Sequence, residues 1–179
     1  MRYFFALVFS LAVASTTAQS TIYQFSLPTS NGAQIDFSAF GGKKILVVNI
    51  STQSQFSSQQ LDELRQLYNQ LKDSGLVIVG IPSNSFGSEP LNSADAASTF
   101  RNFYHIDFPI SILQDVKGAS ISVLYRWLTS KAENGLMDSE VKADFQKYLI
   151  NSSGKLVGVF SSKVTANSEV LRSSIQITQ

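Results

Sequence analysis

Two runs of apolar residues mark the interior of this chain. Residues 45–50 and 76–81 consist almost wholly of Ile, Leu and Val, as expected for strands that are covered on both faces. Between them, Ser57 and Gln60 have capping-box spacing, apolar side chains recur at helical period, and Gly75 is expected to end the helix. The apolar positions of this helix are Leu61, Leu64, Leu67, Tyr68 and Leu71. Strand, helix and strand in this order predict a right-handed βαβ unit with two parallel strands.

Turn signals predict a β-hairpin near each end of the chain. Residues 22–27 and 33–37 alternate between apolar and polar side chains on either side of an Asn-Gly turn. Residues 145–150 and 156–160 flank the turn sequence Asn-Ser-Ser-Gly at 151–154. Both hairpins are expected to add antiparallel strands to the fold.

Three further helices and one short strand complete the pattern. Helices are predicted over residues 94–104, 122–128 and 165–177, and a strand over residues 108–113, which its proline places at a sheet edge. The apolar residues expected to face inward from the last two helices are Val123, Leu124, Trp127 and Leu128, and then Val170, Leu171 and Ile175. The element order predicts one α/β domain, with a central mixed β-sheet flanked by helices on both faces and an N-terminal β-hairpin.

The first residues have the layout of a secretory signal peptide. Arg2 supplies a positive charge, residues 3–14 are almost wholly apolar, and small residues precede Gln19. We therefore expect residues 1–18 to be a signal peptide and residues 19–179 to form a single domain that is secreted or periplasmic. A membrane anchor is the alternative, but an apolar run of ~12 residues falls short of the ~20 that a spanning helix needs.

Composition excludes several classes of function. The chain of 179 residues carries 14 Lys and Arg against 13 Asp and Glu, with a formal net charge of +1 and no basic run. This balance offers no electrostatic attraction to nucleic acid or to an anionic membrane surface. The chain has no cysteine, so disulfides and thiol chemistry are closed to it. We expect a monomer with no membrane span, no cofactor and no metal.

Four local motifs carry a resemblance to a known family. They are Val-Asn-Ile-Ser through Phe in 48–56, Gly-Ile-Pro-Ser-Asn-Ser-Phe-Gly with Glu-Pro in 80–90, Leu-Tyr-Arg-Trp-Leu in 124–128, and Phe-Gln-Lys-Tyr-Leu-Ile with Gly-Lys in 145–155. In this order and near this spacing, they resemble the glutathione peroxidase family, from about Tyr23 to the C-terminus. The resemblance implies a thioredoxin-like fold with a peroxidase site.

This chain departs from the family at each of the four positions that the resemblance assigns to the site. Ser54 matches the peroxide-attacking cysteine or selenocysteine, and Ser85 matches the catalytic glutamine. Ala143 and Asp144 match the tryptophan and the asparagine. A serine hydroxyl stays protonated without a strong base and has no counterpart to the reversible sulfenic acid of cysteine. The negative charge of Asp144 would disfavour a neighbouring anion. All four substitutions therefore predict loss of the peroxidase reaction.

Ser54 could act as a different kind of nucleophile only with the help of a base. His105 is the single histidine of the chain, and no Gly-x-Ser-x-Gly elbow surrounds Ser54. His105 and Asp107 are also too few to hold a zinc ion. We therefore interpret Ser54 as a capping or loop residue at the start of a helix.

The sequence as a whole predicts an exported, cysteine-free protein of the glutathione peroxidase family that has lost peroxidase activity. Its remaining role would be binding or stress-associated, with a protein or small-molecule partner that the sequence does not identify. The alternative is a glutathione peroxidase-type oxidoreductase, active in the response to oxidative stress, with residual or altered activity in the same cleft.

Overall fold

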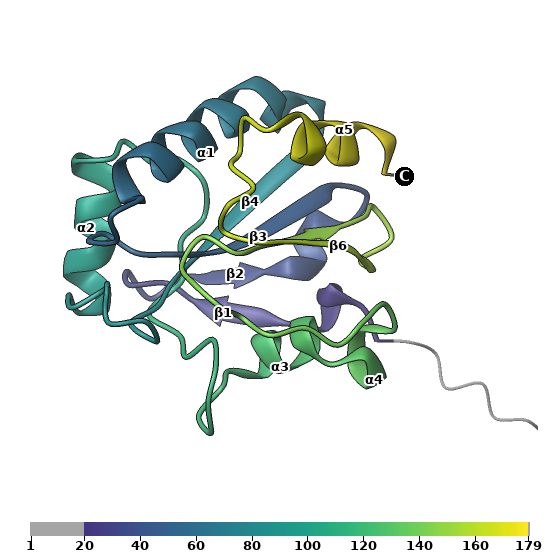
Figure 1. Cartoon of the computed structure of the whole chain (residues 1–179), viewed down its shortest axis with the longest axis horizontal. Coiled ribbons are helices and arrows are strands. Elements are labelled where there is room, and N and C mark those ends of the chain that lie inside the picture. The colour runs from purple at the N-terminus through teal and green to yellow at the C-terminus, as the bar shows by residue number, and fades with distance from the viewer. Residues whose placement is uncertain (1–19, 179) are drawn as a thin grey trace, which may run out of the picture.

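A four-stranded sheet lies at the centre of the computed structural model, which describes residues 20–178 (Figure 1). The strand order is β4-β3-β5-β6. The strands are β3 (Lys44–Ile50), β4 (Leu76–Pro82), β5 (Lys147–Ile150) and β6 (Leu156–Phe160). β3 and β4 are parallel, whereas β5 and β6 join in antiparallel pairing. The predicted mixed sheet is confirmed, while the predicted signal peptide lies outside the described residues.

Two layers cover the sheet. The helices are α1 (Ser57–Leu71), α2 (Ser93–Asn102), α3 (Val123–Thr129), α4 (Lys131–Asn134) and α5 (Glu169–Ile177). Figure 1 shows α1 and α5 over one face, and the hairpin of β1 (Ser26–Pro28) and β2 (Gln34–Asp36) with α3 and α4 over the other. Short 3-10 turns occupy Ile22–Gln24, Phe37–Phe40 and Lys72–Ser74. The predicted flanking of the sheet by helices on both faces is confirmed.

Strand β3 lies in the middle of the sheet and contributes to the core on both of its faces. Ile45 and Val47 pack with the hairpin and α3, whereas Leu46 and Val48 pack with α1 and α5. All four side chains are fully buried. Burying one such side chain stabilises the fold by ~1.5–3 kcal/mol, which explains why an uninterrupted apolar run was needed here.

The N-terminal hairpin is shorter than predicted. Residues 22–24, predicted as strand, form a 3-10 turn, and pairing begins only at Ser26. The Ile22 N–H donates to the Gly154 carbonyl at 2.9 Å, and the Tyr23 hydroxyl donates to the Ser152 carbonyl at 2.8 Å. The segment therefore docks on the β5–β6 turn, and these tertiary bonds override the alternating pattern.

The predicted capping box at the start of α1 is wrong. Ser57 is the first helical residue, and its hydroxyl donates to the Ser51 carbonyl at 2.8 Å. The Gln60 side chain is buried, and its Nε2 donates to the Ser162 carbonyl at 2.7 Å. Both side chains thus tie α1 to loops at the end of the sheet. The first turn of α1 has no side-chain cap at its N-cap residue, Phe56.

Two expected inward-facing valines are exposed. Val123 is 57% exposed in α3 and Val170 is 62% exposed in α5, so both expectations were wrong. Each is the first or second residue of a short helix, where the apolar stripe is carried by later positions. The stripes that do face the core are Leu124, Trp127 and Leu128 in α3, and Leu171 and Ile175 in α5. Helix α5 also begins later than predicted, because the Ser168 hydroxyl caps it by accepting from the Leu171 N–H at 3.4 Å.

Residues 108–113 do not form the predicted strand. They make one isolated parallel bridge, between Gly80 and Ile110, at the edge of β4. Pro109 has no N–H to donate, and the chain then turns so that the Ile112 N–H donates to the Pro28 carbonyl at 2.9 Å. The segment therefore covers the β4 edge without extending the sheet.

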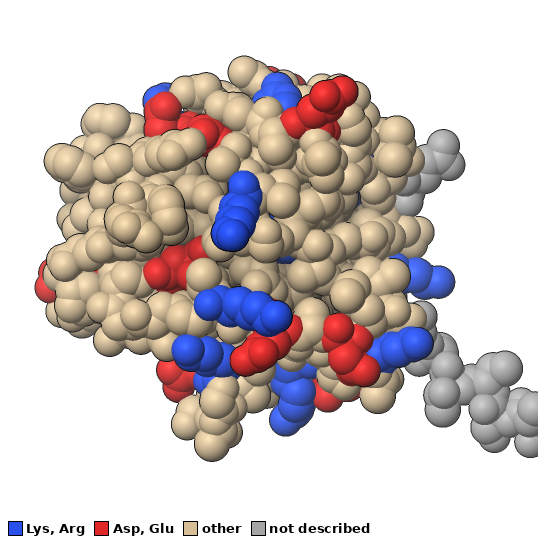
Figure 2. Space-filling view, viewed as in Figure 1, with Lys and Arg blue, Asp and Glu red and all other residues tan. Residues whose placement is uncertain are grey.

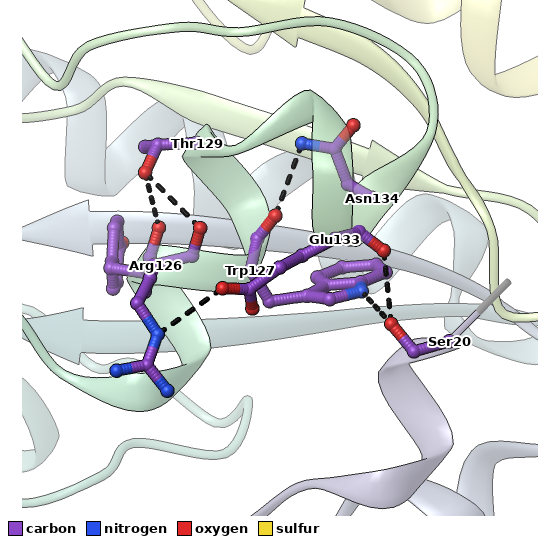
Figure 3. A network of polar contacts seen from close by, with 7 residues as sticks. Ser20, Arg126, Trp127, Thr129, Glu133 and Asn134 are labelled. Carbon is purple, nitrogen blue, oxygen red and sulfur yellow. Dashed lines mark hydrogen bonds and ion pairs between the residues drawn. The ribbon is translucent and has the colours of Figure 1, made fainter.

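A polar network fixes the beginning of the described chain to α3 and α4 (Figure 3). The Trp127 Nε1 donates to the Ser20 hydroxyl at 2.9 Å, which donates to the Glu133 carbonyl at 2.9 Å. Arg126 forms an ion pair with the Glu133 carboxylate at 3.2 Å. The Asn134 Nδ2 donates to the Trp127 carbonyl at 3.1 Å. The two bonds of Ser20 hold the beginning of the described chain against α3 and α4, and the other two contacts join these helices to each other.

The surface carries few charges. On the face drawn in Figure 2, acidic and basic side chains are scattered among neutral ones and form no continuous patch of one sign. Within residues 20–178, no helix combines the length and the hydrophobicity that crossing a membrane would require.

Candidate functional site

The strand order brings Ser54, Ser85 and Asp144 to one end of the sheet, the end at which β3 and β4 finish; this end is called the site edge below. Ser54 follows the end of β3, and Ser85 follows the end of β4. Because β5 runs antiparallel to β3, the residues that precede β5, Ala143 and Asp144, lie at that same edge. In open α/β sheets, the carboxyl ends of parallel strands are the usual place for a ligand site.

Ser54 lies in the turn that leads into α1 and is half-buried. Its carbonyl accepts from the Ser57 N–H at 2.9 Å, and its hydroxyl accepts from the Phe56 N–H at 3.4 Å. Within residues 20–178, no hydrogen bond joins Ser54 to Ser85, Asp144 or the exposed His105. Among these residues, none accepts a hydrogen bond from the Ser54 hydroxyl, so no base is positioned to take its proton.

Ser85 forms its hydrogen bonds with residues other than Ser54. Its hydroxyl accepts from the Ser83 hydroxyl at 3.0 Å and from the Val116 N–H at 3.1 Å. The Ser85 N–H also donates to the Ser83 hydroxyl at 3.2 Å. These bonds stabilise the loop after β4 and connect it to the segment before α3.

Asp144 is a buried carboxylate, only 7% exposed. Its Oδ2 accepts a hydrogen bond from the Ser88 hydroxyl. Burial raises the pKa of Asp144, while Ser88, the nearby Ser51 hydroxyl and the charge of Lys117 act in the opposite direction. Ala143 beside it is half-buried, and its carbonyl accepts from the Asn49 Nδ2 at 3.0 Å.

Glu89 is a second buried acid at this edge, and the sequence reasoning gave it no role. Its carboxylate accepts from the Thr52 N–H at 2.7 Å and from the Thr52 hydroxyl at 2.8 Å. Burial raises the pKa of Glu89; the Thr52 bonds oppose this shift, and the charge of Asp144 adds to it. An acid placed before a proline in a loop of small polar residues was the available signal. Glu89 ties the β4 loop to the loop after β3.

The backbone next to Asp144 is strained. Phe145 has a φ of +65°, a left-handed conformation that is unfavourable for an aromatic residue, and it is fully buried. Its N–H donates to the Asn49 carbonyl at 2.7 Å, and its carbonyl accepts from the Lys147 Nζ at 2.7 Å. Strain of this kind persists only where surrounding contacts enforce it, and it clusters at functional sites.

Lys147 holds this kink from inside the core. It is fully buried, and its Nζ also donates to the Gln60 Oε1 at 3.0 Å. Burial lowers the pKa of Lys147 to about 8, and the charge of Glu63 acts against that shift. A lysine within an apolar strand pattern was a signal that the sequence reasoning passed over. Lys147 is a positioning residue for the segment that carries Asp144.

The comparisons with known proteins point to one family. The glutathione peroxidase family model matches residues 22–129. The glutathione peroxidase homolog BsaA of Staphylococcus aureus (strain MW2) is 36% identical over 142 residues, which are 79% of this chain and 89% of that protein. The crystal structure of Trgpx in apo form is 25% identical with a TM-score of 0.68, and the match covers 90% of this chain and 99% of that one.

A more distant structure shows the wider fold. The thiol:disulfide interchange protein of the thioredoxin family from Chlorobium tepidum TLS has a TM-score of 0.65 at 16% identity, with 92% of this chain and 99% of that chain covered. The fold is therefore thioredoxin-like, as predicted. The family model spans most of the chain, and the BsaA match extends the likeness further. This chain belongs to the glutathione peroxidase family.

Proposed function

We propose that this protein is an exported member of the glutathione peroxidase family that no longer reduces peroxides and has a binding or stress-associated role. Membership in the glutathione peroxidase family supports the broad class, an oxidoreductase of the peroxidase type. One observation carries the finer proposal: Ser54 stands in the turn that leads into α1, in place of a redox-active residue, and within residues 20–178 its hydroxyl makes a single hydrogen bond, accepted from the Phe56 N–H.

The chemistry of the reaction supports this reading of Ser54. A peroxide-reducing residue must be an anion near neutral pH and must accept and return an oxygen atom, as a low-pKa thiolate does. The start of a helix favours an anion, but a serine hydroxyl is too weak an acid to ionise there. No other residue can substitute for the missing thiol, because the chain has no cysteine.

The neighbouring positions support the same proposal. The Ser85 hydroxyl accepts one bond from Ser83 in its own loop and one from the Val116 N–H in the segment before α3. Asp144 places a carboxylate at the edge where the reaction would generate an anion. The Ser85 side chain is shorter than the glutamine that it replaces, and an ionised Asp144 can only accept, whereas the family's amides donate a hydrogen bond to that anion.

A peroxidase assay tests the proposal. Consumption of hydrogen peroxide and of a lipid hydroperoxide would be followed with glutathione and, separately, with thioredoxin as reductant. We expect the unmodified protein to match a blank without protein. Turnover well above the blank would contradict the proposal and favour residual activity in the same cleft.

Two variants test which substitutions caused the proposed loss of peroxidase activity. The fourfold variant Ser54→Cys, Ser85→Gln, Ala143→Trp, Asp144→Asn is expected to gain turnover. Ser54→Cys alone should be slower by at least ~10²-fold, because each preorganised donor near a developing anion is worth that order and the single variant lacks more than one. Ser153→Cys, in the exposed β5–β6 turn, is the matched control for an added thiol. Full activity of Ser54→Cys alone would show that our account of Ser85 and Asp144 is wrong.

The export part of the proposal has its own test. Residues 1–18 have the composition of a signal peptide, and they lie outside the described residues. Mass spectrometry of the protein from the exported fraction is expected to show an N-terminus at Gln19. A protein found only inside the cell with Met1 or Arg2 at its N-terminus would contradict export.

A further inference from the structure

The chain contains two Asn-Gly pairs, and the fold places them in opposite surroundings. Asn31-Gly32 lies in the exposed turn between β1 and β2, whereas Asn134-Gly135 ends α4, where Asn134 is only 3% exposed. A glycine after an asparagine leaves its backbone nitrogen unhindered, because glycine has no side chain. That nitrogen can attack the side-chain carbonyl carbon of the asparagine, and a neighbour held in place attacks faster than a molecule from solution. The two pairs therefore share one chemistry and differ only in their surroundings.

The turn around Asn31 favours this attack. The Asn31 Oδ1 accepts from the Ala33 N–H at 3.2 Å, and the Thr29 hydroxyl lies 2.5 Å from the same oxygen and can donate to it. A bond to the residue after next folds the side-chain carbonyl back towards the Gly32 amide. Negative charge develops on Oδ1 during the attack, so donors at this atom stabilise the reaction intermediate. Gly32 has a φ of +83°, and a Cβ at this position would meet no atom within 4 Å, so the backbone here is open.

The leaving group at Asn31 is not held by the fold. Asn31 is exposed, and its Nδ2 makes no hydrogen bond within residues 20–178. The Gly32 N–H donates to the Thr29 carbonyl at 3.1 Å, and this bond is lost when the nitrogen gives up its proton. Because the turn is exposed to solvent, water or hydroxide can act as the base.

Asn134 has similar donors on its oxygen but a bound leaving group. Its Oδ1 accepts from the Leu136 and Met137 N–H groups at 2.7 and 3.1 Å. Its Nδ2 donates to the carbonyls of Trp127, Leu128 and Met137 at 3.1, 3.2 and 3.1 Å, and Figure 3 shows the first of these bonds. The nitrogen can leave only after these buried bonds are broken, which costs free energy. The decisive difference between the two pairs therefore lies at Nδ2.

We propose that Asn31 is a site of spontaneous deamidation and that the fold protects Asn134 from the same reaction. The Gly32 nitrogen loses its proton to water or hydroxide and forms a bond to Asn31 Cγ. The Cγ–Nδ2 bond breaks, and the nitrogen leaves as ammonia. The cyclic succinimide then takes up one water, which opens one of its two C–N bonds to give aspartate or isoaspartate. Nothing is oxidised or reduced. The inference goes beyond the proposed function and depends neither on the loss of peroxidase activity nor on export.

Deamidation would place a negative charge on the wall of a groove. The groove has a volume of about 500 Å³ and lies between the β1–β2 turn, α2 and the segment at Pro109. Asn31 and Arg101 both line it, and Arg101 forms no ion pair in the part of the chain that the structure describes. An aspartate keeps the oxygen that accepts from Ala33, so the turn is retained, while the formal net charge of +1 falls by one. An isoaspartate adds a carbon to the main chain and would disturb the register of the hairpin.

Peptide mapping of the full chain by mass spectrometry tests the proposal. The protein is kept for days at neutral and at mildly alkaline pH, either folded or unfolded in guanidinium chloride. In the unfolded chain, we expect the two pairs to deamidate at rates within about threefold, because only the local sequence acts there. In the folded protein, Asn134 should be slower than Asn31 by ~10²-fold or more, since a buried amide must first lose several hydrogen bonds.

Three variants locate the chemistry. Asn31→Gln is expected to abolish the modification, because the longer side chain would have to close a less favourable ring. Asn102→Gln, at an exposed position that lines the same groove, is the matched control and should leave the reaction at Asn31 unchanged. Thr29→Val is expected to slow the reaction by about tenfold, because it removes one donor from Oδ1. The acidic form that accumulates should comigrate with Asn31→Asp in isoelectric focusing.

Two results would overturn the proposal. One is a rate at Asn31 in the folded protein that lies closer to the rate of folded Asn134 than to that of the unfolded chain. The other is deamidation of Asn134 as fast as that of Asn31 without denaturant. An unchanged rate in a folded Thr29→Val would overturn the role given to that hydroxyl. If Thr29→Val does not fold, the two rates in the unmodified protein decide the question alone.

Discussion

Two sets of buried polar side chains, one on each side of the central sheet, differ in their hydrogen bonding. On the α1 side, Lys147 and Gln60 both have partners: Lys147 donates to the Gln60 Oε1 and to the Phe145 carbonyl, and Gln60 donates to the Ser162 carbonyl. On and beside the α3 side, Asn49 and Tyr125 each keep a buried oxygen without a partner among residues 20–178. Both sets lie in the interior of the same domain.

The difference shows what each set contributes. A buried polar group with all its bonds made rigidifies the core and costs little, whereas an incomplete one costs free energy. The Lys147 cluster therefore stabilises the strained segment before β5. The buried groups that lack a bond on the α3 side cost stability instead.

The largest expected effect comes from breaking the complete cluster. Lys147→Ala removes two hydrogen bonds and leaves a cavity, so we expect the free energy of unfolding to fall by ~3–4 kcal/mol. Lys155→Ala, at an exposed position, should change it by less than ~0.5 kcal/mol. Urea unfolding measures both, and equal effects of the two substitutions would contradict the role given to Lys147.

The pH dependence of the same cluster has a defined sign. Burial lowers the pKa of Lys147 from 10.5 to about 8, so between these values the unfolded chain binds more protons than the folded one. Stability contributed by this group should therefore rise as pH rises from about 8 to about 10.5, by ~2 kcal/mol. The buried tyrosines also titrate at high pH. Subtracting the pH profile of the unfolding free energy of Lys147→Met, measured with urea, removes their contribution and leaves that of Lys147. A difference profile that is flat or falls over this window would contradict the assignment.

Asp144→Asn tests the buried acid at the site edge. Because burial raises the pKa of Asp144, the folded state favours the protonated form, and this contribution to stability is lost as pH rises through the raised pKa. At pH 7, we expect the variant to be more stable by ~1 kcal/mol, with the gain vanishing near pH ~3. Denaturation at both pH values is the measurement. Destabilisation at pH 7 would mean that the carboxylate is already satisfied.

A matched pair of tyrosines gives the smallest and sharpest contrast. The Tyr148 hydroxyl accepts from the Gln146 Nε2 at 2.8 Å, whereas the Tyr125 hydroxyl is buried without a partner among residues 20–178. Tyr148→Phe should cost ~1 kcal/mol, and Tyr125→Phe should be neutral within ~0.5 kcal/mol or slightly stabilising. Thermal unfolding of both variants checks the contrast. A larger loss in Tyr125→Phe would show that its hydroxyl has a partner in solution.

Much of the fold could be predicted because buried positions are apolar and recur in the sequence at the period of the strand or helix that carries them. The apolar runs at 45–50 and 76–81 became β3 and β4, and the leucine stripe between them became α1. The predictions failed where tertiary bonds decided the local structure. Residues 22–24 turned to reach the loop at Gly154, and Ser57 and Gln60 bonded to distant carbonyls. Such contacts join segments far apart in the chain and leave no local pattern.

Some features of the candidate site were also determined by the sequence alone, and others only by the tertiary structure. The sequence by itself determined that Ser54 stands where the family has its reactive residue and that no thiol exists anywhere in the chain. Only the tertiary structure decided that Asp144 is buried beside Asn49 and Ser51, that Phe145 is strained, and that Lys147 holds that strain. The physical reason is that covalent identity is local, whereas burial and hydrogen-bond partnership depend on which segments the folded chain brings together.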